Sequence, residues 1–577
     1  MIAKKIIKAL KEATNTEDVK LDIPSEKNHG DYATNVALCI DDCQKRPPRE
    51  VAEEIKDKIL KNFELKKILD KIEIAGPGFI NFFLTNSALV DFVNRVNSVD
   101  SLTPYLENEK MGKVVVEYSS PNIAKPFGIG HFRSTVIGDA IANLLEATGW
   151  KVYRDNHLGD WGTQFGKQLY AIKKWGDITK IENSENPVKE LVSLYVRFHE
   201  EADKDPSLEE RGREWFKRLE SGDAEARALW QKCVNWSIKE FGRVYKKLGV
   251  KFTENDGLGY GESYFEHMMQ PVLVELEKKG LLVEGEEGAK LVFFKDNKYP
   301  PLMLIKKDGT TLYATRDLAA DKFRLEKYGK DIVIINEVGA EQSLYFQQIF
   351  EIEKMLGWIK EGQRVHIKHG LFRLKDRKMS TRKGDVIWLM DVITEAEEKA
   401  EKLINTSTKG KMVTGHSLTD KDSIKRLIEE VAIGALKWNE LKRDPVKDIV
   451  FDWDEILSME GNSGPYLQYT YARIASILSK SVPEIETVST VFDNKEKEVA
   501  RVLIHYPEIV KDAARFYSPH ILANYLFYLA REFNYFYNSE RILGHKREST
   551  RLLLIKAIGR VLKHGLGILG IESPEKM

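Results

Sequence analysis

A short apolar run that leads into a Pro/Gly loop and then a helix constrains the fold of this chain most. Residues 114–118 read VVVEY, and apolar side chains recur at helical spacing between Val136 and Leu145. A continuous apolar run beside a helix is typical of a parallel strand buried on both faces. Helical patterns separate this run from three further strand candidates, KVYRDN (151–156), DIVIIN (331–336) and RVHIKHGLF (364–372). We therefore predict an α/β fold with a doubly wound, Rossmann-type parallel sheet.

The patterns on either side of this sheet predict additional domains. Residues 1–105 alternate helical and strand-like segments, with Gly76-Pro77-Gly78 as a turn, and indicate a small α+β domain. The sheet domain is expected over residues 113–405, with a charged helical insertion at about 187–290. Residues 423–577 read as an α-helical bundle. One bundle helix is expected to begin at Ser518-Pro519, with Ser518 as its N-cap.

Composition excludes several classes of protein. Hydrophobic residues make up 42% and charged residues 31% of the 577, as in soluble globular proteins. Lys and Arg together number 89, as do Asp and Glu, so net charge gives no indication of nucleic-acid binding. Three cysteines, Cys39, Cys43 and Cys233, are too few for a disulfide framework or a four-ligand zinc site. No run of 18 apolar residues occurs, so we expect no membrane span and a cytoplasmic location.

The segment EYSSPNIAKPFGIGHFRST, residues 117–135, joins the first strand to the helix. Such a junction presents free backbone N–H groups, and Gly128 and Gly130 allow a ligand to approach the backbone. His131 can donate to a phosphate oxygen, and Lys125 adds a positive charge. The segment suits a nucleotide phosphate, although taken alone it is more often an ordinary Gly/Pro loop.

A second segment, LKDRKMSTRKGDVIWL at residues 374–389, concentrates positive charge in a loop that contains glycine. Lys378, Arg382 and Lys383 repel one another unless an anion offsets their charge, and a polyphosphate would do so. A solvated basic loop is the commoner outcome for a charge run considered by itself.

Taken together and in this order, the two segments resemble the HIGH and KMSKS signatures of class I aminoacyl-tRNA synthetases. Further segments resemble the arginyl-tRNA synthetases, and they extend over nearly the whole chain. These are SSPNIAKPF, NHLGDWGTQFG (156–166), TLYATRDLAA (311–320), KMSTRKG (378–384) and EGNSGPYLQYTYARIASIL (460–478). NHGDYATNVAL and GPGFINFFL resemble that family's additional N-terminal domain, which binds tRNA, and the last helices resemble its anticodon-binding domain.

The resemblance implies activation of L-arginine by ATP, supplied with Mg²⁺, and transfer to the terminal adenosine of tRNA(Arg). The chemistry needs no covalent enzyme intermediate and no protein-bound structural metal, so positioning and charge neutralisation should dominate catalysis. Phosphate handling is expected from Lys125, His131, Lys378 and Lys383. ATP binding is expected from Gly128, Gly130, His131, Met379 and Ser380. The sequence departs from the signatures at Gly128 and Thr381. Either Lys125 or a neighbouring backbone N–H is expected to take over the role of the histidine absent at position 128, and the resemblance implies that Lys125 compensates for Thr381.

A guanidinium is recognised best by carboxylates with a hydroxyl alongside. Glu117, Tyr313 and Asp317 supply these groups, and Tyr313 and Asp317 share a helix face if their segment is helical. By the resemblance, the amino-acid backbone end is expected to bind Ser120, Asn122, His131 and Gln348. Without the resemblance, Tyr313 and Asp317 would read as a surface pair.

Contacts to tRNA are expected at both ends of the chain. The candidates are Phe79, Asn81, Tyr469, Tyr471 and Met577. Residues 541–577 hold eight Lys/Arg against three acids, which predicts a local basic surface. A monomer is expected. Two alternatives remain: a tRNA-binding paralogue with impaired catalysis, and a class I cysteine enzyme, whose zinc would need cysteine ligands that this sheet domain lacks.

Overall fold

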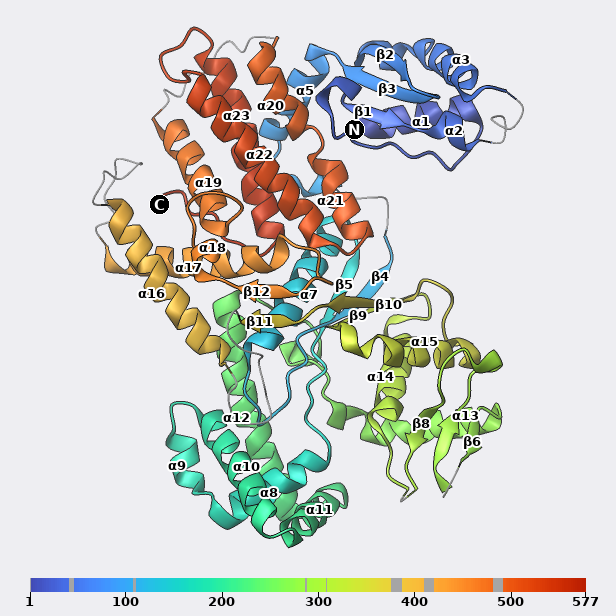
Figure 1. Ribbon diagram of the computed structural model, residues 1–577, viewed down its shortest axis with the longest axis vertical. Helices are drawn as coiled ribbons and strands as arrows, with labels where there is room; N and C mark the ends of the chain where they lie inside the picture. Colours follow the sequence, from blue (N-terminus) through green and yellow to red (C-terminus); the bar gives the residue numbers. More distant parts are fainter. Residues whose placement is uncertain are drawn as a thin grey trace.

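A four-stranded parallel sheet forms the middle of the computed structural model (Figure 1). The structure describes residues 2–40, 46–106, 111–285, 288–307, 309–374, 387–408, 420–480 and 491–577. The sheet has the order β10-β9-β4-β5, with bounds β4 Lys113–Glu117, β5 Lys151–Asp155, β9 Val333–Gly339 and β10 Arg364–His369. All four predicted strands are confirmed, because each predicted segment overlaps one strand of this sheet, and β4 and β9 are its two interior strands.

The order of the strands fixes where a ligand can bind. From β4 the chain proceeds outward to β5 through helix α7 (Ile129–Ala147), whereas β9 and β10 lie on the other side of β4. The direction of winding therefore reverses between β4 and β9. Ligands of doubly wound sheets bind at the carboxyl ends of the strands beside this switch point. Glu117 ends β4 there, and Gly339 ends β9.

Two lobes lie below the sheet in Figure 1. One is helical and contains α8 Thr163–Trp175, α9 Ile178–Asn183, α10 Pro187–Lys204, α11 Ser207–Glu220 and α12 Ala224–Leu248. It corresponds to the helical insertion expected at about 187–290, but it begins earlier, at α8, and ends at α12. The other contains η4 Glu262–Met268, α13 Met269–Lys278, α14 Tyr313–Tyr328 and α15 Ser343–Leu356. It also holds an antiparallel sheet of β6 Leu282–Glu284, β7 Lys290–Val292 and β8 Leu302–Ile305. This small sheet was not expected from the sequence, because its strands are too short for a pattern to stand out.

The N-terminal domain has the predicted α+β character. Its antiparallel sheet has the order β1-β3-β2, and the turn between β2 and β3 is the predicted Gly-Pro-Gly. Gly76 adopts a φ of +50° there, a conformation that favours glycine. The elements are α1 Ile2–Thr14, η1 Lys27–His29, β1 Tyr32–Thr34, α2 Val36–Cys39, α3 Pro48–Leu60, α4 Phe63–Lys66, β2 Leu69–Ala75, β3 Phe79–Leu84 and α5 Asn86–Ser98.

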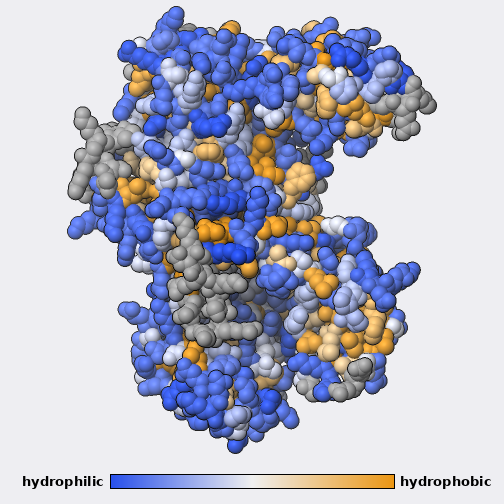
Figure 2. All heavy atoms as spheres, viewed as in Figure 1, coloured by the Kyte–Doolittle hydropathy of each residue, from blue (hydrophilic) through white to orange (hydrophobic). Residues whose placement is uncertain are grey.

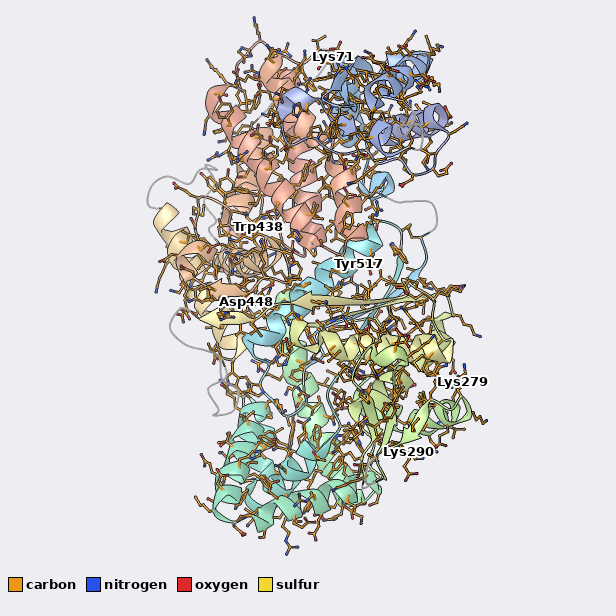
Figure 3. The ribbon with its side chains drawn as sticks, turned by 45° about the vertical axis from the view of Figure 1, so that its right-hand side comes forward. Lys71, Lys279, Lys290, Trp438, Asp448 and Tyr517 are labelled. Atoms are coloured by element: carbon orange, nitrogen blue, oxygen red, sulfur yellow. The ribbon has the colours of Figure 1, made fainter. Side chains whose placement is uncertain are left out.

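The C-terminal region is helical, as predicted, and packs above the sheet (Figure 1). Its main helices are α17 Lys421–Leu441, α19 Gly464–Ser479, α20 Asn494–Leu503, α21 Tyr506–Arg515, α22 Pro519–Ser539 and α23 Glu548–Ile568. Trp438 of α17, labelled in Figure 3, is fully buried. Its Nε1 donates to Asn462 at 2.8 Å. Phe533 of α22 is also fully buried. Helix α22 begins as predicted, with Ser518 at the N-cap position and Pro519 at the first helical position. The Ser518 hydroxyl makes no capping hydrogen bond, however, because it donates to the carbonyl of Phe516.

The N-terminal domain docks on the C-terminal helices rather than on the parallel sheet. Asn86 makes reciprocal hydrogen bonds with the backbone of Phe492, at 2.8 and 2.7 Å. Arg501 lies 3.1 Å from the buried Asp31. Helix α5 packs against α20 and α23. The two ends of the chain thus form one packed unit. Figure 2 shows a hollow between this N-terminal domain and the lobe that carries α14 and α15. No helix in the described ranges is long and apolar enough to cross a membrane.

Candidate active site

The loop that joins β4 to α7 is conformationally strained and held by buried hydrogen bonds. Ser119, Ser120 and Ala124 have φ values of 72°, 44° and 57°, in the left-handed region that non-glycine residues rarely adopt. Such strain persists only where the surroundings enforce it, and it concentrates at functional sites. The amide of Ser119 donates to Ser134 Oγ at 2.9 Å, and that of Ser120 donates to Asn156 at 3.0 Å.

A cavity of about 570 Å³ opens at this loop, at the switch point of the sheet. Two arginines and three histidines are among its described lining residues: Arg324, Arg364, His131, His157 and His369. Six carboxylates line it as well: Glu117, Glu262, Asp317, Asp321, Glu337 and Glu341. Because carboxylates outnumber the permanently charged guanidiniums, the cavity favours a cationic ligand.

His131 is held as a neutral hydrogen-bond donor at the start of α7. The amide of Gly128 donates to its Nδ1 at 3.2 Å, so the ring proton of the neutral form lies on Nε2. Burial lowers the pKa of His131 to about 4, and the charges of Lys125 and His369 contribute to this shift. Outside its own helix, a Cβ at Gly130 would meet no atom of the described residues within 4 Å, which leaves space for a ligand. His131 can therefore donate to an oxyanion at neutral pH.

Lys125 lies in the same loop, partly buried and outside the cavity lining. Burial lowers the pKa of Lys125, and the carboxylate of Glu262 opposes this effect. A lysine whose charge is poorly solvated gains most from an incoming anion, which fits the role in phosphate handling predicted for it.

The predicted guanidinium-binding residues Glu117, Tyr313 and Asp317 all line the cavity. Helix α14 begins at Tyr313, so the predicted helical spacing of Tyr313 and Asp317 is present. Asp317 accepts a hydrogen bond from the hydroxyl of Tyr345. Glu117 is shared with the protein's own Arg324, whose Nη2 lies 2.5 Å from it. Nothing in the sequence indicated this pairing.

Only some of the residues predicted to bind the amino and carboxylate groups of the substrate amino acid lie at the cavity. Ser120, Asn122 and His131 line the cavity, and the buried Ser120 hydroxyl makes no hydrogen bond within the described protein. Gln348 is buried on α15, donates to the carbonyl of Pro300 at 2.7 Å and does not line the cavity. The structure therefore brings together all of this predicted set except Gln348.

The predicted basic loop lies outside the described residues, and so do its candidates Lys378, Met379, Ser380 and Lys383. The chain that follows returns directly to the glycine turn. The amide of Ile129 donates to the carbonyl of Ile387 at 3.1 Å, and that of Leu389 donates to Phe127 at 2.9 Å. The end of the second motif is thus adjacent to the first, although about 260 residues separate them in sequence.

Several lining residues had no role predicted from sequence. His157 and Glu262 face Asp317, and His369 binds Glu337 at 2.7 Å. Burial raises the pKa of Glu262 to about 7, with Asp317 and Asp160 adding to the shift and His157 and Arg316 opposing it. Position at the carboxyl ends of β5 and β9 was the available signal for His157 and Glu337, since both follow or end a predicted strand.

The predicted tRNA contacts differ in exposure. Phe79 is 42% exposed at the start of β3, whereas Asn81 is buried within the same strand. Tyr469 is half-buried, with the Arg473 guanidinium 4.9 Å from its ring centre. Met577 packs against the helical core, and Tyr471 is buried.

The predicted basic surface of residues 541–577 is smaller than the residue count implied. Arg551 is buried and contacts Glu496, Asp493 and Glu540. Arg547 also pairs with Glu496. These two arginines neutralise internal carboxylates and are not free to meet an RNA backbone.

Three family models match the chain in succession. The model for the N-terminal domain of arginyl tRNA synthetases matches residues 1–84. The model for the catalytic domain of class I tRNA synthetases (R) matches 96–453, and that for the DALR anticodon-binding domain matches 467–577.

Relatives and solved structures agree with these matches along the full length. The arginine–tRNA ligase of Halothermothrix orenii is 40% identical over 577 residues, 98% of this chain and 97% of its own. That of Clostridium botulinum is 41% identical over 571 residues, 96% of each chain. The crystal structure of the Plasmodium falciparum arginyl-tRNA synthetase superposes with a TM-score of 0.84 at 26% identity, covering 100% of this chain and 99% of its own. The chain therefore belongs to the arginyl-tRNA synthetase family of class I aminoacyl-tRNA synthetases.

Proposed function

We propose that the chain ligates L-arginine to the 3′-terminal adenosine of tRNA(Arg) in two steps and that the cavity at the switch point holds arginine and ATP. The observation that carries this proposal is the pairing of a carboxylate-rich cavity with a neutral histidine at the start of α7. The carboxylates suit a guanidinium, and the helix start suits a phosphate.

In the first step, a carboxylate oxygen of arginine attacks the α-phosphorus of ATP, and the bond to pyrophosphate breaks. Glu117, Tyr313 and Asp317 hold the guanidinium, while Ser120, Asn122, His131 and Gln348 are assigned to the backbone end. Of these, Gln348 has the least support, because its amide is engaged with Pro300. In the second step, the ribose hydroxyl of the tRNA attacks the arginyl carbonyl and releases AMP.

Neutralisation of the phosphate charge is the main catalytic demand of this chemistry. His131 donates from Nε2, and Lys125, Lys378 and Lys383 supply cations. Gly128, Gly130, Met379 and Ser380 are assigned to ATP, which enters as its Mg²⁺ complex, and no structural metal is required.

For tRNA we assign Phe79, Asn81, Tyr469 and Met577. The exposed ring of Phe79 is suited to stacking on an unpaired base. The hollow beside the N-terminal domain supports binding of a large ligand on that side (Figure 2). We further propose that the chain acts as a monomer in the cytoplasm.

The test is aminoacylation of total tRNA with each standard amino acid, together with ATP–pyrophosphate exchange with and without tRNA. Arginine alone should be charged, and exchange should require tRNA, because bound tRNA completes the site in this scheme. Efficient charging of cysteine or lysine with arginine inert would refute the proposal. Binding of tRNA without charging of any amino acid would establish the alternative, a catalytically impaired paralogue.

A further inference from the structure

His157 presents a buried ring nitrogen toward the cavity. The residue follows β5, and its Nδ1 lies 3.0 Å from the carbonyl oxygen of Tyr260. A carbonyl only accepts, so Nδ1 carries a hydrogen. The other nitrogen, Nε2, is buried and makes no hydrogen bond within the described protein. It lies 3.6 Å from Asp317 Oδ1, an ion-pair distance that is too long for a direct hydrogen bond.

This arrangement allows two stable states of His157. A lone pair on Nε2 facing a carboxylate is unfavourable unless a donor lies beside both. The donor can be a proton on Nε2 itself, which makes the ring a cation paired with Asp317. Alternatively, an N–H group of a bound guanidinium can serve Asp317 and Nε2 together, since a guanidinium carries five such donors.

We propose that His157 and substrate arginine compete for Asp317, so that the imidazolium neutralises Asp317 before arginine binds and arginine binding expels the Nε2 proton to solvent. This inference rests on the proposed function, because it takes arginine as the ligand of Asp317. His157 would then act as a positioning and specificity residue. A neutral amino acid offers no cation to replace the proton and leaves the pair undisturbed.

The charges around His157 favour the protonated ring in the absence of arginine. Burial opposes the charge, but Asp317 of α14 and Glu117 of β4 raise the pKa of His157 to about 10 against the opposing charge of Arg324. Glu262 of η4 and Asp160 of the same loop also interact with His157. A guanidinium placed at Asp317 adds a like charge next to the ring, which lowers this pKa and releases the proton.

Glu262 is a second group that can release a proton when arginine binds, so its contribution must be distinguished from that of His157. A bound guanidinium also lowers the pKa of Glu262, which is raised to about 7 before binding. Glu262 therefore releases protons near and below pH 7, but it is already ionised at pH 8. His157 remains protonated at pH 8. Because the charge of His157 also lowers the pKa of Glu262, each comparison is repeated in a Glu262→Gln background, in which only His157 can contribute the difference.

The test is calorimetric titration of L-arginine, without ATP, into the full-length protein at pH 8, with and without tRNA, in buffers of different ionisation enthalpy. The dependence of the apparent heat on the buffer gives the number of protons released. Wild type should release about one proton more than His157→Asn, which keeps a donor for Tyr260 but cannot titrate. The α-amino group of arginine contributes equally in both proteins and cancels in the difference.

His267→Asn is the matched control, because His267 is an exposed residue of η4 that does not line the cavity. It should release as many protons as wild type. Equal release by wild type and His157→Asn would overturn the inference, even in a protein that charges arginine normally. His157→Gln repeats the test if the Asn variant fails to fold. If the wild-type protein did not charge tRNA with arginine, the proposed function itself would be refuted instead.

Discussion

Replacing Asp317 with Asn removes the carboxylate proposed to oppose the substrate guanidinium while keeping the volume of the side chain. Asp317 is partly buried in the cavity wall, with 27% of its side chain exposed, and Tyr345 holds one of its oxygens. The substrate contact is therefore a charge-assisted one with little solvent screening. Its loss should cost roughly 1.5–3 kcal/mol. Since each 1.4 kcal/mol is about a tenfold change, the KM for arginine should rise about ten- to a hundredfold.

Steady-state aminoacylation kinetics, with arginine and ATP varied in turn, measure this effect. The KM for ATP should change little, because no adenine or phosphate group is assigned to Asp317. Asp331→Asn is a matched control, because the Asp331 side chain is 93% exposed. Its Oδ1 lies 3.6 Å from Nζ of Lys360, whose side chain is also exposed, so this surface ion pair contributes little. It should leave both constants unchanged. An equal rise in both KM values for Asp317→Asn, or no rise in either, would refute the assignment.

Three further perturbations test other parts of the structure. Lys125→Ala should lower the rate of pyrophosphate exchange by orders of magnitude with little change in tRNA affinity, because its contact strengthens as phosphate charge develops; full activity would transfer the role to Lys378 and Lys383. Burial lowers the pKa of His505 from 6.5 to about 3. Between pH 7 and pH 5, His505 therefore takes up a proton in the unfolded chain but not in the folded one, which should lower the free energy of unfolding by roughly 2 kcal/mol. Urea unfolding at both pH values should show a smaller loss in His505→Phe than in wild type, and an equal loss would contradict this. Phe533→Ala should lower the free energy of unfolding by about 3–5 kcal/mol in the same assay, whereas a change below 1 kcal/mol would mean that α22 contributes little to the core.

The helices and strands that could be predicted from the sequence are those in which the spacing of apolar residues shows which side chains are buried. Two strands of the parallel sheet were predicted because VVVEY and DIVIIN contain continuous apolar runs, and the other two because KVYRDN and RVHIKHGLF are short segments that helical patterns separate from these runs. The start of helix α22 was predicted because Ser518-Pro519 is typical of the first residues of a helix. The strands β6–β8 were missed, since three or four residues carry too little periodicity to distinguish a strand from a loop.

The sequence predicted which residues line the site better than it predicted which residues pair with them. Glu117 and Asp317 were identified by chemistry and by resemblance, and both line the cavity. Their partners Arg324 and Tyr345 are contacts brought about by folding, and a single sequence does not reveal them. The same limit applies to Asn81 and Gln348, whose amides turn inward because neighbouring strands and loops surround them.

The docking of the first domain on the last helices has a consequence for synthesis on the ribosome. Asn86 and α5 contact partners that begin at Phe492, so the N-terminal domain emerges long before its packing surface exists. At about 5–20 residues per second, this wait lasts roughly 20–80 s. During that interval the apolar face of α5, which includes Leu89 and Val93, lacks its final cover. A nascent chain stalled before α20 should therefore recruit chaperones that bind exposed apolar helices, and release of the finished chain should end that association.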